Sequence, residues 1–194
     1  RENNIPEWFI ESCKKISYLF PRAHAVAYVM MAFRIAWFKV YHPLAFYAAY
    51  FSIRAKAFDL RIMTGDLNTQ LKEFNRIKAL DRGASPKEKD LMSALEVSME
   101  MYQRGYRFIN VDIQHSGARR FSIKDGALLP PFLAIDSLGE TVADAIVEER
   151  DTKPFTSLKD LQRRCKVSAT IIETMKELKC CGDLPEDEQM SLFG

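Results

Sequence analysis

Residues 135–146 combine a short turn with the start of a helix, and this combination can bind an anion. The segment reads Ile135-Asp-Ser-Leu-Gly-Glu-Thr-Val-Ala-Asp-Ala-Ile146. We expect Gly139 to permit a tight turn. The first backbone N–H groups of a helix have no partner within it, so those of Gly139, Glu140 and Thr141 can point at a phosphate. An ordinary pair of helices joined by a turn explains the same pattern without a ligand.

A second candidate lies near the N-terminus, where Phe20-Pro-Arg-Ala-His-Ala-Val-Ala-Tyr28 leads into a predicted helix. A histidine at a helix start is more often structural than catalytic. No paired carboxylates, nucleophile–base pair or glycine-rich phosphate loop accompanies His24 in the sequence. Spacing alone therefore assigns no catalytic residue and no metal site.

The third candidate is the C-terminal peptide Gln189-Met190-Ser191-Leu192-Phe193, which follows an acidic stretch. Gln189 can hydrogen-bond at the rim of a groove while Leu192 and Phe193 fill an apolar pocket. Burying two such side chains contributes roughly 1.5–3 kcal/mol each, which gives micromolar affinity at best. Such a weak tether becomes useful when the rest of the protein is held nearby. The alternative is a frayed terminus with two stray apolar residues.

The elements that position these candidates are predicted to be mainly helical. Prolines, a Ser85-Pro-Lys-Glu88 capping pattern and apolar periodicity mark the helices. We expect them near residues 6–19, 22–41, 43–57, 59–81 (one long helix or a broken pair), 85–105, 139–150, 157–165 and 168–179. The alternating segments 107–113 and 119–124 predict two strands, with a possible third at 127–129. The tail after Gly182 lacks periodicity, and we expect it to be mobile. The predicted fold class is mainly α with a small β element.

Composition is typical of a folded soluble protein, with 47% hydrophobic and 28% charged residues among 194. The formal net charge of +2 by itself argues against a nucleic-acid binder. The charge is segregated, however, because residues 1–58 carry 8 basic and 3 acidic side chains. The last twelve residues carry four acidic side chains and no basic one. Backbone N–H groups that bind phosphate do not enter this count, so net charge is a poor test here.

Cysteine usage and hydropathy point to the cytoplasm. The four cysteines form no CxxC pair, which favours reduced thiols. The most apolar run, Ala25–Phe33, is nine residues long before Arg34, whereas a membrane-spanning helix needs about twenty. We therefore expect a buried helix in a soluble protein with no membrane partner.

In combination these motifs resemble a known family. Residues 135–146 resemble the helix-hairpin-helix element, with Ser137 where the first glycine of that hairpin usually stands. Phe20–Val29, running on to Phe38-Lys-Val-Tyr-His-Pro-Leu44, resembles the fingers region of bacterial C-family replicative polymerases. With Tyr106-Arg107, the hairpin and the terminal Gln-x-Ser-Leu-Phe, the order is similar to the C-terminal part of PolC-type DNA polymerase III α subunits.

This resemblance implies that the chain is the end of a longer enzyme that extends DNA from dNTPs. The parent would be a DNA-directed DNA polymerase whose palm carboxylates hold two Mg²⁺ ions. Those ligands have no counterpart in this chain, so we expect the fragment alone to be inactive. By the same resemblance, Phe20, Arg22, His24 and Tyr28 lie near the incoming dNTP, while 137–141 (Ser137, Gly139, Glu140 and Thr141) holds duplex primer–template DNA. Residues 189–193 would dock on the bacterial sliding clamp (β).

The resemblance also divides the chain into four parts. We expect a helical fingers region at 1–106, a short β segment at 107–132, a helix-hairpin-helix duplex-binding domain at 133–182 and a flexible clamp-binding tail at 183–194. A free-standing, non-enzymatic module that binds DNA and the clamp is the alternative interpretation. An initiator methionine just before Arg1 would favour that alternative, and palm-type acidic motifs upstream would favour the polymerase.

Overall fold

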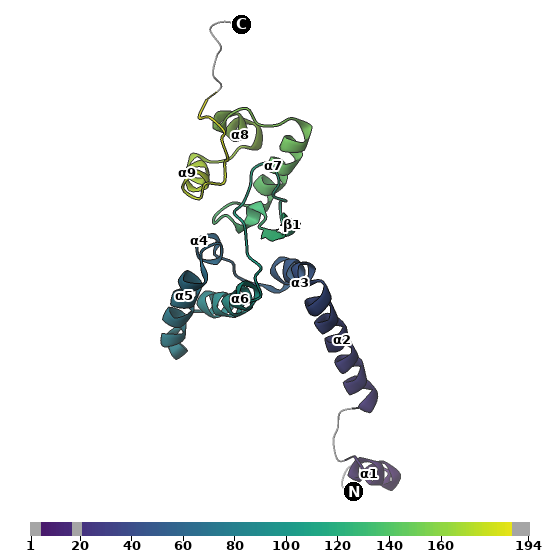
Figure 1. Cartoon of the computed structure of the whole chain (residues 1–194). Helices are drawn as coiled ribbons and strands as arrows, with labels where there is room; N and C mark the ends of the chain where they lie inside the picture. Colours follow the sequence, from purple (N-terminus) through teal and green to yellow (C-terminus); the bar gives the residue numbers. More distant parts are fainter. Residues whose placement is uncertain (1–4, 17–20, 188–194) are drawn as a thin grey trace, which may run out of the picture. The chain divides into compact units, whose positions relative to one another are not determined.

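The computed structural model describes residues 5–16 and 21–187, and the chain divides into two compact units. The first unit is Arg1–Tyr41 and the second is His42–Gly194. The candidate residues Phe20 and 189–193 lie outside the described ranges. Figure 1 labels the α-helices of each unit.

The first unit contains α1 (Glu7–Lys14) and α2 (Arg22–Tyr41). Within the described chain α2 is not the buried helix that was predicted: none of its residues is buried, and Val29 and Phe33 are 67% and 75% exposed. The physical reason is that the described residues of this unit form no second layer against which α2 could bury its apolar side chains. Of the helices in the described residues, α2 is long and apolar enough to cross a membrane, with a mean hydropathy of 1.2. Core helices of soluble proteins meet the same criterion of length and composition.

The second unit begins with a series of helical segments, of which Figure 1 labels the α-helices. They are α3 (Pro43–Ala49) with a π-helical turn at Tyr50–Arg54, α4 (Leu60–Met63), α5 (Leu67–Ala79), a 3₁₀ turn at Asp81–Gly83, and α6 (Pro86–Gln103). The predicted capping box is confirmed, because the Ser85 hydroxyl accepts from the Glu88 N–H while the Glu88 carboxylate accepts from the Ser85 N–H. The 59–81 segment is a broken pair, since Asp66 caps a new helix by accepting from the Thr69 N–H.

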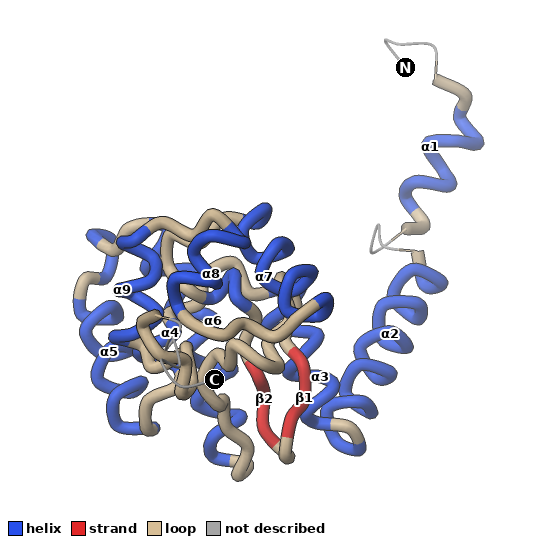
Figure 2. Tube along the Cα trace, turned by 90° about the horizontal axis from the view of Figure 1, so that it is seen from above, coloured by secondary structure: helices blue, strands red, loops and turns tan. Residues whose placement is uncertain are grey.

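The β element is a single hairpin of β1 (Ser122–Lys124) and β2 (Ala127–Leu129), antiparallel with Ile123 opposite Leu128. Figure 2 shows these strands in red, joined by a tight turn. The strand predicted at 107–113 does not form: Phe108 makes only an isolated bridge to Leu128. From Asn110 onward this segment no longer runs beside β2. The Asn110 side-chain amide donates to the Leu178 carbonyl, and the Ile113 N–H donates to the Cys180 carbonyl.

The chain ends in three further helices that follow a 3₁₀ turn. This turn is Phe132–Ala134, and the helices are α7 (Glu140–Thr152), α8 (Leu158–Cys165) and α9 (Ala169–Glu177), within a few residues of their predicted bounds. Two apolar clusters support the unit. One is centred on α7–α9 and includes Ile135 and Leu138, and the other packs α3, α5 and α6 around Tyr47 and Leu95.

Candidate nucleic-acid interface

The turn before α7 is anchored by two buried side chains. Ile135 and Leu138 are 1% and 5% exposed and belong to the cluster beneath α7–α9. The Leu138 N–H donates to the Ile135 carbonyl at 3.2 Å, which closes the turn. Because these two apolar residues face the core, the intervening residues and the start of α7 lie exposed at the surface.

The strained residue of this turn is Ser137 rather than Gly139. Ser137 has a φ of 64°, the left-handed conformation that glycine adopts most easily. Gly139 has a φ of −78° and a ψ of 158°, and a Cβ added there would meet nothing within 4 Å. The expectation that Gly139 permits the tight turn was therefore wrong. Inside the described chain, neither backbone conformation nor packing requires glycine at this position.

The N-terminus of α7 leaves its backbone donors exposed. Gly139 is the N-cap and offers no side-chain oxygen to the first turn. The first helical bond runs from the Ala143 N–H to the Gly139 carbonyl at 3.0 Å. Within the described residues, no acceptor is hydrogen-bonded to the N–H groups of Gly139, Glu140 or Thr141. With the positive end of the helix dipole, this arrangement favours an anion such as phosphate.

An arginine from a distant segment lies beside this helix start. Arg119 donates from Nη1 to Glu140 and from Nε and Nη2 to Asp144, with the Nε–Oδ1 distance at 3.0 Å. These hydrogen bonds hold the pKa of the Asp144 carboxyl below its ordinary value. Sequence reasoning did not identify Arg119, because the pairing joins residues 21 and 25 positions apart.

Comparison with known proteins agrees with this geometry. Residues 105–190 match the helix-hairpin-helix motif family. Over 193 residues the chain is 49% identical to DNA polymerase III PolC-type of Caldanaerobacter subterraneus subsp. tengcongensis. The alignment covers all of this chain and 14% of that protein. The chain is also 48% identical over 195 residues to the PolC-type polymerases of Streptococcus pyogenes, of which it covers 13%. The chain is homologous to the C-terminal part of PolC-type DNA polymerase III. It thus spans about one-seventh of the length of these relatives.

The turn before α9 has the same backbone form as the turn before α7. Lys166 has a φ of 53°, Val167 is 2% exposed, and Ser168 is the N-cap of α9. This order repeats the left-handed residue, the buried aliphatic residue and the N-cap at the start of α7. The Ser168 hydroxyl, however, accepts from the Ile171 N–H at 3.3 Å. The α9 terminus is therefore partly satisfied within the chain, whereas the α7 terminus has no such side-chain cap.

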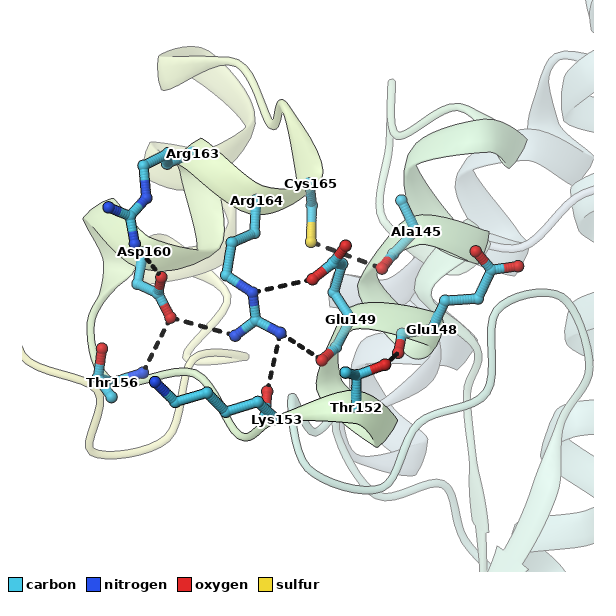
Figure 3. Close-up of polar contacts among 10 residues, drawn as sticks. All are labelled: Ala145, Glu148, Glu149, Thr152, Lys153, Thr156, Asp160, Arg163, Arg164 and Cys165. Atoms are coloured by element: carbon cyan, nitrogen blue, oxygen red, sulfur yellow. Dashed lines mark hydrogen bonds and ion pairs between the residues drawn. The ribbon is translucent and has the colours of Figure 1, made fainter.

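Figure 3 shows how Arg164 of α8 binds the end of α7. Its Nε donates to Glu149 Oε2 at 2.9 Å, and its Nη2 donates to the carbonyls of Glu149 and Lys153. The guanidinium also lies 4.7 Å from the centre of the Phe155 ring. Cations at a helix C-terminus stabilise its exposed carbonyls, so Arg164 fixes α7 against α8 at the opposite end from the turn.

The first part of the acidic tail is bound to α8 and α9. The Leu158 N–H donates to the Pro185 carbonyl at 2.9 Å, and Lys176 pairs with Glu186 at 2.6 Å. The expected mobility after Gly182 therefore does not apply to residues 183–187, because helix-borne donors and a lysine hold them. The clamp-peptide candidates 189–193 lie beyond the described residues.

In the first unit, the structure brings together two of the predicted nucleotide-binding residues. The rings of His24 and Tyr28 lie one helical turn apart in α2, with centroids 4.5 Å apart. Arg22 is the first residue of that helix. Among the described residues, no three His, Cys, Asp or Glu side chains gather where a metal ion could bind. The Mg²⁺ ions implied by the polymerase family therefore have no fitting ligand set in the described chain.

Proposed function

We propose that this chain is the C-terminal region of a replicative DNA polymerase and that it holds duplex DNA through the turn at 137–141. The observation that carries the proposal is the uncapped start of α7 with its exposed backbone donors. The similarity to PolC-type polymerases, which extends over the whole of this chain, supports it. N–H groups contact phosphate without reading bases, which suits an enzyme that must hold any sequence.

The reaction we propose for the whole enzyme is DNA synthesis on a primed template. The primer 3′-hydroxyl gives up its proton to solvent and attacks the α-phosphorus of an incoming dNTP. A phosphodiester bond forms, the bond from the α-phosphorus to the bridging oxygen breaks, and pyrophosphate leaves. Two Mg²⁺ ions, held by carboxylates outside this chain, would activate the hydroxyl and neutralise the phosphates. The contribution of this chain to the nucleotide would come from Arg22 and His24 toward the triphosphate, and from Phe20 and Tyr28 toward the base and sugar.

The apolar surface of α2 fits the same proposal. Its exposed side chains include Phe33 and Trp37, which are 75% and 46% exposed, and it contains Arg34 and Lys39. We propose that other parts of the polymerase polypeptide cover this helix, so that it is a core helix of the fingers in a cytoplasmic enzyme. The chain spans only about one-seventh of its relatives, which leaves ample polypeptide for this role.

The C-terminal peptide is proposed to tether the polymerase to the bacterial sliding clamp. Gln189, Met190 and Ser191 would bind along the groove while Leu192 and Phe193 enter its pocket. Replacing Leu192 and Phe193 by Ala should abolish clamp binding and leave duplex binding unchanged. Surface plasmon resonance on immobilised clamp measures the first effect, and retained clamp binding would remove this assignment.

The duplex-binding proposal is tested by Gly139→Val. A Cβ at residue 139 has open space, so the variant should fold normally while its side chain keeps a phosphate from the N–H groups. Losing hydrogen bonds to a charged group costs about 1.5–3 kcal/mol each, so we expect at least about tenfold weaker duplex binding by fluorescence anisotropy.

A matched control for this experiment is Gly83→Val. Gly83 also has open space around its Cβ position, but it lies in the connection between α5 and α6 rather than in the turn. We expect this variant to bind duplex DNA like the parent chain. Equal binding by the Gly139 and Gly83 variants and the parent chain would overturn the proposed role of 137–141.

A further inference from the structure

The helix that is proposed to bind phosphate carries two carboxylates in its first turns. Glu140 and Asp144 are four residues apart on α7, and their side chains are 65% and 37% exposed. Acidic groups at this position favour helix formation, but they repel a DNA phosphate that approaches the same helix end. The start of α9 differs, because the first helical turn of α9 has no acidic residue.

Arg119 contacts both carboxylates at once. Its guanidinium pairs with Glu140 at 2.5 Å and with Asp144 through two hydrogen bonds. The backbone before it is fixed by the Phe132 N–H donating to Gly117 at 2.9 Å and the Leu133 N–H donating to Ala118 at 3.1 Å. Arg119 is therefore held by the segment that leads directly into the turn.

Stability gives little reason for this arrangement. The Arg119 side chain is 50% exposed, and exposed ion pairs contribute little to folding because water and salt screen them. Gly139, adjacent to Glu140, likewise has no steric or conformational reason within the described chain. Both features are explained if an anionic ligand approaches this helix end closely.

We propose that Arg119 is a positioning residue of the phosphate site, which offsets one of the two negative charges of Glu140 and Asp144 so that a DNA phosphate can reach the N–H groups of α7. This inference rests on the proposed duplex-binding function. Without Arg119, the first turns of α7 would present two uncompensated negative charges to the phosphate. With it, they present one.

The inference predicts opposite effects from the two sides of the same ion pair. Arg119→Gln should weaken duplex binding about three- to tenfold at low salt, and Asp144→Asn should strengthen it by a similar factor. The double variant should return to nearly the affinity of the parent chain. All three differences should shrink as salt is raised. Fluorescence anisotropy with a labelled duplex and the full 194-residue chain provides the measurement.

A matched control separates local compensation from total charge. Arg120 is the exposed neighbour, and it forms no ion pair with another described residue. Arg120→Gln makes the same change in net charge, but Arg120 pairs with neither carboxylate, so we expect a smaller loss of duplex binding than with Arg119→Gln. Thermal unfolding of each variant shows whether folding is intact.

The outcomes distinguish this inference from the function on which it rests. If Gly139→Val binds DNA like the parent chain, the proposed function fails. If Gly139→Val loses binding but Arg119→Gln and Asp144→Asn change it in the same direction or not at all, only the role of Arg119 is overturned. A merely structural ion pair would give the same-direction result.

Discussion

Asp160 and Arg164 form an ion pair of 3.2 Å within α8, and both side chains are largely shielded from water, with exposed fractions of 6% and 15%. Burial opposes the charged form of Asp160, but hydrogen bonds from Arg163, the Thr156 N–H and Arg164 outweigh it and lower the pKa of the carboxyl. Since Arg164 also hydrogen-bonds to the C-terminal end of α7, this pair links α8 to α7.

The lowered pKa of Asp160 predicts how acid affects stability. Its stabilising contribution is present above the unfolded pKa of about 3.9 and is lost as the pH falls through the lower folded value. Asp160→Asn should therefore reduce the free energy of unfolding at neutral pH by about 1–3 kcal/mol. Its difference from the parent chain should shrink below about pH 4. Urea unfolding at several pH values measures this.

The matched control for that series is Asp136→Asn. Asp136 is exposed, and its replacement should change stability little at any pH. A deficit in Asp160→Asn that stays constant down to the lowest pH would contradict the charge-based explanation.

The left-handed conformation of Ser137 predicts a stabilising substitution. A non-glycine residue in this conformation costs roughly 1–2 kcal/mol, so Ser137→Gly should raise the free energy of unfolding by about 1 kcal/mol. Lys166→Gly, at a φ of 53°, should do the same, because it has the same backbone conformation. Thr170→Gly within α9 is the control, and it should destabilise by about 0.3 kcal/mol. A loss of stability in both left-handed variants would refute this account.

Cysteine labelling should separate one thiol from three. Cys13 is exposed, whereas Cys165, Cys180 and Cys181 are buried, and burial raises the pKa of these three thiols to about 11, 12 and 11. Because the thiolate is the reactive form, brief alkylation of the native chain at mildly alkaline pH should add a single label. Intact mass spectrometry should show four labels after denaturation, and rapid native labelling of more than one site would be inconsistent with the described core.

Duplex binding by the isolated chain should be weak and should fall further as the salt concentration rises. A turn that contacts about two phosphates gives a slope of about −2 in a plot of log affinity against log salt concentration. We expect weak binding by the isolated chain that is lost above physiological salt. Nanomolar binding that does not change with salt would exclude a mechanism based on a few backbone contacts.

The sequence by itself determined the elements whose signals are local. The Ser85–Glu88 capping box, the prolines and the apolar periodicity were sufficient to place most helices, since helix ends depend on residues only three or four positions apart. The turn before α7 was predicted for the same reason. The family resemblance could also be recognised in the sequence, because it depends on the order of motifs along the chain.

Tertiary structure decided the features that join distant residues. The segment at 107–113 alternates like a strand, but Asn110 and Ile113 find backbone partners at Leu178 and Cys180 instead of a neighbouring strand. The periodicity of α2 indicated an apolar surface but not what covers it. The backbone angles showed that Ser137 is the strained residue of the turn. The pairing of Arg119 with the carboxylates of α7 joins residues more than twenty positions apart. Local patterns carry no information about either.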